Sequence, residues 1–153
     1  MMRLCSDVLE ALAGKYLCTA ESLTGGGIGA ALTAVPGASK VFKGGIISYT
    51  DEVKREVLGV PAADLNTFGA VSAPVAEAMA RGVRELLKAD IAVSVTGLAG
   101  PDGDEFGHPV GTVYIGYADE NTVMAEEYHF SGDREAVRCQ TIESALSLIF
   151  SKM

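Results

Sequence analysis

The stretch that decides the fold is residues 15–33, KYLCTAESLTGGGIGAALT. Its first part, Lys15 to Ala20, is a short, mainly apolar run that is typical of a buried strand. Its last part, Gly25 to Thr33, opens on three consecutive glycines and continues with small and aliphatic residues, which predicts a helix. A strand, a tight polar loop and a helix in this order indicate an α/β domain.

Helix and strand signals continue to alternate on either side of this stretch. The other predicted elements are, in chain order, a helix at Ser6–Ala13, a strand at Val41–Tyr49, a helix at Asp51–Leu58, a loop at 59–72, a helix capped by Ser72 with Pro74 in its first turn, a strand at Ile91–Val95, strands at Gly111–Ala118 and Thr122–Phe130, and a helix that starts at 131–133. The last two strands are joined by a short turn around residues 119–121, so at least one strand pair is antiparallel. The sequence therefore predicts a layered α/β domain with a mixed sheet.

The composition limits the class of protein. The chain has 153 residues, of which 48% are apolar and 21% charged, so we expect residues 1–153 to form a single domain with one core. The 12 basic and 20 acidic residues give a net charge of −8, which argues against nucleic-acid binding because such domains carry a basic face. The chain has no Trp and only 7% aromatic residues, so it supplies few side chains on which bases could stack.

The sequence also predicts a cytoplasmic protein without a membrane segment. The N-terminus has an acid where a signal peptide needs apolar residues, and the longest uncharged run, Ser22 to Ser39, is interrupted by glycines. Cys5, Cys18 and Cys139 form no CxxC pair, which predicts neither a disulfide framework nor a zinc site. We expect all three cysteines to be small buried side chains, and we reject Cys18 as a nucleophile because it falls within the first predicted strand.

The loop from Glu21 to Gly27 is the first candidate site. Open α/β sheets bind ligands beyond the carboxyl ends of their strands, and the N–H groups at a helix N-terminus favour a phosphate or an oxyanion. The alternative is a plain helix cap followed by a turn. A second glycine-rich loop, Thr96 to Gly103, follows the buried strand at 91–95 and is the next candidate.

A dinucleotide-binding loop is a further alternative for the first site. The pattern Gly25-x-Gly27-x-x-Ala30, with Asp51 just after the next strand, is close to that fingerprint. The polar residues that precede these glycines stand where the fingerprint turns tightly, which disfavours this interpretation.

Six sequence blocks carry a resemblance to a known family: AESLTGG at 20–26, GGIISYTDEVK at 44–54, GAVS at 69–72, TGLAGP at 96–101, PVGTV at 109–113 and GDR at 132–134. In this order and spacing they resemble the C-terminal domain of the competence-damage-inducible CinA proteins, whose free-standing members are nicotinamide mononucleotide amidohydrolases. The resemblance implies a three-layer α/β/α fold with a five-stranded mixed sheet. It also implies a homodimer.

The resemblance implies a serine amidase mechanism. Ser22 matches the nucleophile and Lys54 the base, with Thr24 and Tyr49 positioning the pair. A serine hydroxyl needs an adjacent base, and burial can lower the pKa of a lysine enough for it to act as one. The backbone N–H groups of Gly25 and Gly26 are candidates to hold the oxyanion, and Thr96, Gly97 and Gly100 are expected to contact the substrate.

The implied reaction is hydrolysis of nicotinamide mononucleotide to nicotinic acid mononucleotide and ammonia, with no cofactor and no metal. The alternative is a CinA-like module that binds a nucleotide or a partner protein without turnover.

Three residues depart from the family pattern. Leu23 stands where Cys is common, which is neutral if the side chain faces inward. Asp51 replaces the usual Asn, and a carboxylate near Lys54 would stabilise the ammonium form and weaken the base. His108 stands where Lys is common, which removes a positive charge near neutral pH.

Arg134 and Arg138 are the candidates for binding the substrate phosphate. They lie four residues apart, on one face of the last predicted helix. A cation in the first turn faces the positive end of the helix dipole, and a residue that accepts this cost is a candidate for phosphate binding. The alternative is that both arginines pair with Asp133, Glu135 or a carboxylate of another subunit.

Overall fold

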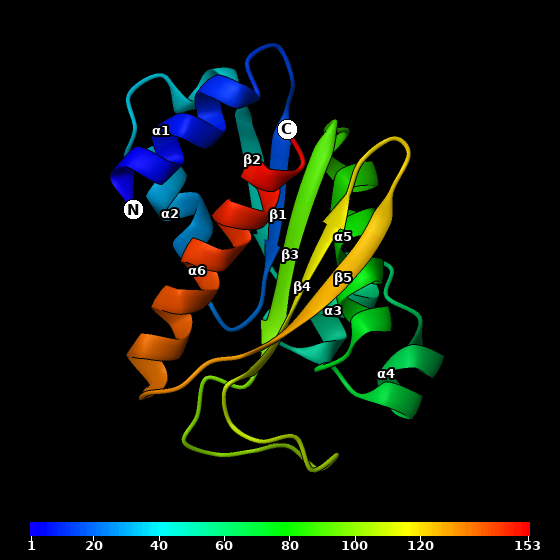
Figure 1. Ribbon diagram of the computed structural model, residues 1–153. Coiled ribbons are helices and arrows are strands. Elements are labelled where there is room, and N and C mark those ends of the chain that lie inside the picture. The colour runs from blue at the N-terminus through cyan, green and yellow to red at the C-terminus, as the bar shows by residue number, and fades with distance from the viewer.

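A five-stranded mixed sheet lies at the centre of the computed structural model, which describes residues 1–153 (Figure 1). The strands are β1 (Leu17–Glu21), β2 (Phe42–Ile47), β3 (Ile91–Gly97), β4 (Thr112–Ala118) and β5 (Val123–His129), in the spatial order β2-β1-β3-β4-β5. Strand β1 pairs in parallel with β2 and β3, whereas β4 is antiparallel to both β3 and β5. The mixed sheet and the antiparallel β4–β5 hairpin are therefore confirmed.

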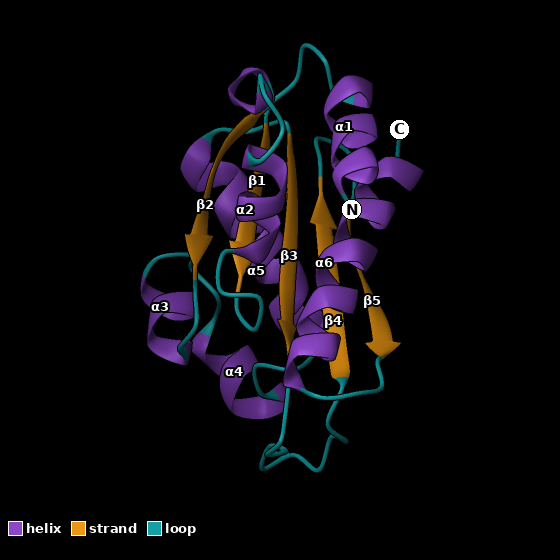
Figure 2. Cartoon of the chain, turned by 90° about the vertical axis from the view of Figure 1, so that its left-hand side faces the viewer, coloured by secondary structure: helices purple, strands orange, loops and turns teal.

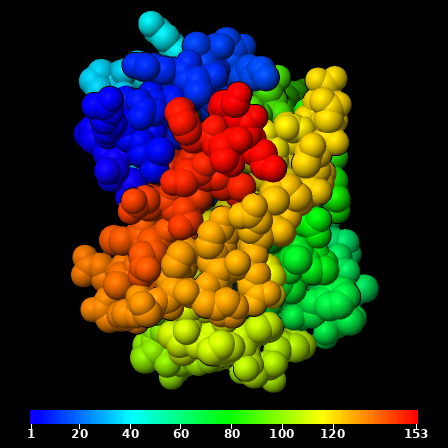
Figure 3. Space-filling view, viewed as in Figure 1, coloured from blue at the N-terminus to red at the C-terminus, as the bar shows by residue number.

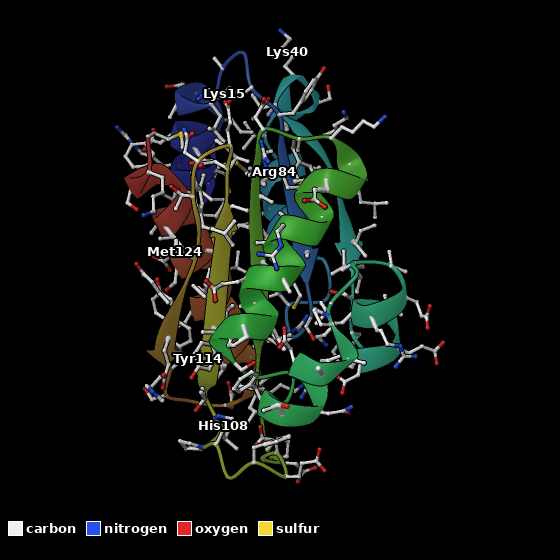
Figure 4. The ribbon with its side chains drawn as sticks, turned by 90° about the vertical axis from the view of Figure 1, so that its right-hand side faces the viewer. Lys15, Lys40, Arg84, His108, Tyr114 and Met124 are labelled. Carbon is white, nitrogen blue, oxygen red and sulfur yellow. The ribbon has the colours of Figure 1, made fainter.

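Helices cover both faces of this sheet. On one face lie α1 (Met2–Ala11), α2 (Gly27–Thr33) and α6 (Arg134–Ser151), which stand in front of the strands in Figure 2. On the other face lie α3 (Asp51–Glu56), α4 (Ala62–Phe68) and α5 (Ala73–Leu87), with α5 in front of the sheet in Figure 4. A short 3-10 helix, η1 (Ala38–Lys40), precedes β2. The three-layer α/β/α fold is thus confirmed.

Each face of the sheet buries its own apolar cluster. Under α1, α2 and α6 the cluster includes Leu17 and Val93, and under α5 it includes Cys18 and Ala92. Successive residues of β1 and β3 thus point into opposite clusters, as the alternation of a strand requires. Because β1 and β3 are parallel neighbours, their carboxyl ends lie at the same edge of the sheet, and both strands are buried along nearly their whole length.

Helix α5 begins as predicted. The Ser72 hydroxyl accepts a hydrogen bond from the Val75 N–H, and Pro74 lies in the first turn. At Gly82 the helix packs so closely on the backbone carbonyl of Leu58 that a Cβ there would clash with it. This contact holds the segment that follows α3 against α5.

The prediction of a loop at 59–72 is wrong, because α4 lies within this segment. Pro61 is the N-cap of α4, and Gly69 (φ +75°) is its C-cap. Both residues bound the helix rather than interrupt it. Only Leu65 of α4 is buried, so these seven residues give no helical periodicity in the sequence.

The cysteine prediction is correct for two residues and wrong for the third. Cys5 and Cys18 are buried, and burial raises the pKa of the Cys18 thiol to about 12, which fits its rejection as a nucleophile. Cys139 is exposed. It lies two residues from both Val137 and Thr141, which face the core, and therefore points away from the sheet. None of the helices combines the length and apolarity needed to cross a membrane.

Candidate active site

A cavity of about 490 Å³ lies at the edge of the sheet where β1 and β3 end. The loop between β3 and β4 projects below this edge, at the lower end of the molecule in Figures 1 and 3. Seven of the predicted site residues line the cavity: Ser22, Tyr49, Lys54, Thr96, Gly97, Gly100 and Arg134. The other four, Thr24, Gly25, Gly26 and Arg138, lie outside its lining.

Ser22 and Lys54 are in direct contact. Ser22 follows the last residue of β1, and Lys54 is on α3, whose start is fixed by the Thr50 hydroxyl accepting a hydrogen bond from the Val53 N–H. The Lys54 Nζ donates a hydrogen bond to the Ser22 Oγ at 3.2 Å. Ser22 is 8% exposed and Lys54 only 2%, and no carboxylate forms an ion pair with Lys54.

The environment of Lys54 favours the neutral amine. Burial lowers its pKa, and the negative charge of Asp51 raises it, with a net effect downward. Desolvation therefore outweighs the carboxylate that replaces the usual Asn. A buried neutral amine within hydrogen-bond distance of a hydroxyl can remove the hydroxyl proton, which is the geometry that an activated serine needs.

Glu21 fills the N-terminus of α2, a role that the sequence analysis missed. Its Oε1 accepts hydrogen bonds from the Thr24 hydroxyl at 2.6 Å and the Ile28 N–H at 2.8 Å, and its Oε2 accepts one from the Gly29 N–H at 3.1 Å. The helix is thus capped by the protein's own carboxylate, which agrees with the helix-cap alternative and leaves the N–H groups of Ile28 and Gly29 unavailable to a phosphate. An acid at the end of a buried strand, just before a glycine-opened helix, is the signal that could have indicated this cap.

The turn after Ser22 does not use both predicted oxyanion donors. Gly25 (φ +57°) and Gly26 (φ +96°) adopt left-handed conformations, which glycine tolerates. The Gly25 N–H donates back to the Ser22 carbonyl at 3.1 Å, whereas the Gly26 N–H has no acceptor within the protein. The Thr24 hydroxyl donates a hydrogen bond to Glu21 and forms none with Ser22 or Lys54.

Arg134 reaches across the cavity from the first turn of α6. Its guanidinium donates to the Gly100 carbonyl at 2.7 Å and to the Tyr49 hydroxyl at 2.9 Å. Tyr49 makes no hydrogen bond to Ser22 or Lys54. The guanidinium instead links the strand-end segment of Tyr49 to the loop after β3.

Arg138 binds the turn that carries Ser22 and does not face the cavity. Its Nε donates to the Leu23 carbonyl at 3.0 Å and its Nη2 to the Thr24 carbonyl at 3.2 Å. Pairing of Arg134 or Arg138 with Asp133 or Glu135 does not occur, and the Asp133 carboxylate instead caps α6 by accepting from the Ala136 N–H at 2.9 Å. Arg138 is therefore placed to hold the turn rather than to meet a phosphate.

The remaining predicted contacts on β3 have partners within the protein. The Thr96 hydroxyl donates to the Ala70 carbonyl at 2.9 Å, which ties β3 to the segment before α5. Gly97 passes so close to the backbone of β4 that a Cβ would lie 2.6 Å from the Thr112 carbonyl oxygen. Both residues line the cavity through the edge of the strand. Leu23 is buried in the core, so its side chain faces inward.

The loop after β3 gives the cavity an acidic rim formed by Asp102, Asp104 and Glu105, and it also brings Phe106 to the lining. Asp104 accepts hydrogen bonds from the His108 ring at 2.7 Å and from the His108 N–H at 3.0 Å. Partial desolvation raises the pKa of Asp104, but these contacts outweigh it and hold the pKa below its usual range. His108 is thus engaged with the protein's own carboxylate. No group of three or more His, Cys, Asp or Glu side chains is arranged to hold a metal ion.

Comparison with known proteins places the whole chain in one family. The family model of the CinA C-terminal domain matches residues 2–153. A CinA-like protein of Geobacter sp. (strain M21) is 49% identical over 138 residues, which cover 90% of this chain and 33% of that protein. A nicotinamide-nucleotide amidohydrolase, PncC, of Pseudomonas putida is 49% identical over 128 residues, which cover 84% of this chain and 80% of that protein.

Solved structures agree with these relatives. The competence damage-inducible protein A of Klebsiella pneumoniae superposes with a TM-score of 0.96 at 37% identity, covering 99% of this chain and 95% of that one. A CinA superfamily protein of Escherichia coli gives a TM-score of 0.97 at 34% identity, covering 99% and 90%. The chain spans about a third of the length of the CinA-like relatives and most of the length of the amidohydrolase. It belongs to the CinA C-terminal domain family.

Proposed function

We propose that the protein hydrolyses the carboxamide of nicotinamide mononucleotide, giving nicotinic acid mononucleotide and ammonia. The observation that carries this proposal is the buried contact between Lys54 Nζ and Ser22 Oγ at the cavity wall. The name of the Pseudomonas putida relative supports the choice of substrate. We further propose that residues 1–153 act as one amidohydrolase domain.

In the proposed reaction, Ser22 Oγ attacks the carboxamide carbon while neutral Lys54 takes the hydroxyl proton. The tetrahedral intermediate collapses by breaking the carbon–nitrogen bond, and Lys54 returns the proton to the leaving nitrogen, which departs as ammonia. The nicotinoyl ester on Ser22 is then attacked by water, with Lys54 again accepting the proton. Collapse releases the carboxylate product and restores the serine hydroxyl.

The other residues serve these two groups. Of the two predicted oxyanion donors, only the Gly26 N–H has no acceptor in the protein, so it is the proposed donor even though Gly26 is not among the residues that line the cavity. Arg134 and Tyr49 face the cavity and are the proposed partners of the phosphate. Thr24 is a positioning residue in this proposal, because its hydroxyl donates a hydrogen bond to the Glu21 carboxylate, which is next to Ser22 in the chain.

The test is release of ammonia and of the acid nucleotide by the purified protein, followed by chromatography. Ser22→Ala and Lys54→Met should each lower kcat by roughly a thousandfold or more, because each removes one half of the proton-transfer pair. Ser39→Ala and Lys40→Met are matched controls, because both residues are exposed on η1. Figure 4 shows Lys40 at the end of the molecule opposite His108, so both controls should retain wild-type rates.

No ammonia release at any pH between 5 and 10 would overturn the proposal. Calorimetric binding of the nucleotide in that case would favour the non-catalytic binding module. Equal activity of the wild-type protein and the Lys54→Met variant would instead retain the reaction but remove Lys54 from it.

A further inference from the structure

We propose that the cavity selects a substrate whose ring carries a positive charge, and that Asp102 and Glu105 are the residues that make this selection. The proposal rests on the proposed function and narrows its substrate class. An oxidised pyridinium nucleotide is accepted, and the 1,4-dihydropyridine form, which has the same carboxamide and phosphate but a neutral ring, is disfavoured.

The charge lining the cavity is unbalanced. Four carboxylates line it, from Asp51, Asp102, Asp104 and Glu105, against two basic side chains, Lys54 and Arg134. Even when both basic side chains are charged, the four carboxylates leave the cavity lining with a net negative charge. The cavity as a whole therefore favours a ligand that brings positive charge to it.

Three of the four carboxylates, from Asp51, Asp102 and Glu105, have no hydrogen-bond or ion-pair partner within the protein, and the last two of these lie on the loop that rims the cavity. Asp104 is held by His108, and Asp51 lies at the start of α3, where it acts on Lys54. An ionised carboxylate that faces a binding cavity without a partner favours a cation there.

The aromatic side chains at the cavity fit the same ligand. Phe106 and Tyr49 line it, and they are 42% and 57% exposed. The Phe106 ring packs over Gly69, where a Cβ would lie 2.5 Å from a ring carbon, so the glycine leaves room for it. An aromatic face attracts a flat cation more strongly than a neutral ring of the same shape.

The charges also match the two ends of the proposed substrate. Arg134 has no carboxylate partner and faces the cavity, so it can meet the phosphate while the acidic rim meets the ring. A dihydropyridine nucleotide keeps the phosphate that can meet Arg134 but has no ring charge for the acidic rim. A pyridinium riboside keeps the ring charge but has no phosphate for Arg134. Each compound therefore probes one half of the cavity.

Binding should be measured by calorimetry in the Ser22→Ala background, where turnover and the differing reactivity of the two carboxamides do not enter. The ligands are nicotinamide mononucleotide, its 1,4-dihydro form and nicotinamide riboside. Asp102→Asn and Glu105→Gln are each added to this background separately. Each should raise the Kd of the two cationic-ring ligands about tenfold, while the Kd of the dihydro form changes by less than about twofold. Glu120→Gln, in the β4–β5 turn and outside the cavity lining, is the matched control for loss of one negative charge.

Two results would overturn the inference: equal weakening of all three ligands, which would make the carboxylates structural, or no change for any of them. Both are distinct from failure of the proposed function. That function fails if the wild-type protein releases no ammonia, whereas this inference fails if release occurs but the charge of the ring does not decide binding.

Discussion

The ionisation of Lys54 is set by two influences of opposite sign: burial lowers its pKa and the Asp51 carboxylate raises it. Because the base must be neutral, the proposed activity should rise with pH as Lys54 loses its proton. Asp51→Asn removes the influence that raises the pKa. We therefore expect the rising limb of the pH profile of kcat/KM to move to lower pH, with the gain largest at the acidic end of the range.

Glu52→Gln is the control for this change. Glu52 is the next residue on α3, is exposed, and is not among the groups that shift the pKa of Lys54. Its substitution removes the same charge from the same turn and should leave the profile in place. An unchanged profile in Asp51→Asn would show that Lys54 is not the group that titrates.

At the scale of single residues, the sequence indicated which side chains meet, and it could not indicate which hydrogen bonds they make. The resemblance paired Ser22 with Lys54, and the structure places them in contact at 3.2 Å. Thr24 was expected beside that pair, but its hydroxyl reaches Glu21. A hydroxyl bonds to the nearest acceptor in three dimensions, and a local motif does not contain that information.

At the scale of elements, one face of α6 carries two arginines that have different contacts at the site. Arg134 enters the cavity, whereas Arg138, one turn later, holds the carbonyls of Leu23 and Thr24. The two arginines share a helix face, as their spacing predicted, but the turn that follows Ser22 lies only against the second. Their contributions should therefore separate in kinetics.

Arg138→Met should lower kcat about tenfold or more with KM nearly unchanged, because the turn that orients Ser22 loses two hydrogen bonds. Arg134→Met should instead raise KM for nicotinamide mononucleotide and spare KM for its riboside, which has no phosphate. Arg138→Lys should recover part of the lost rate, since an ammonium can still donate to one of the carbonyls. Equal KM effects in Arg138→Met and Arg134→Met would instead restore a shared phosphate role.

The elements themselves were predictable where apolar residues recur, and unpredictable where they do not. Helix α5 buries Val75, Met79 and Val83 along one face, and its start and type were predicted. Helix α4 buries only Leu65, so Pro61 and Gly69 were interpreted as loop residues when they are in fact its two ends.

At the scale of the whole molecule, the net charge of −8 acts on any charged substrate before it reaches the cavity. The nucleotide carries a net negative charge near neutral pH, and the riboside is a cation. Raising the salt concentration from about 0.02 to 0.3 M screens both fields. We expect kcat/KM to rise for the nucleotide and to fall for the riboside, each by a few-fold, measured with a neutral salt at constant pH.

Changes of the same sign for both substrates would contradict this expectation, because a nonspecific salt effect acts alike on both.

The layered architecture of the molecule was largely predictable from the sequence, since alternating helices and strands admit few arrangements. The strand order was not derivable from local patterns: β1 lies between β2 and β3, which depends on contacts across the whole chain.

The hydrogen bonds from Arg138 on α6 to the turn after Ser22 also have a consequence for synthesis of the chain. The turn after Ser22 is bonded by Arg138, a residue 114 or 115 positions further along the chain. The ribosome therefore adds Ser22 to the growing chain long before it adds Arg138, the residue whose side chain holds the turn after Ser22. Until α6 has emerged and docked, the nascent chain lacks both hydrogen bonds, so we expect the proposed activity to appear only when the last helix is in place.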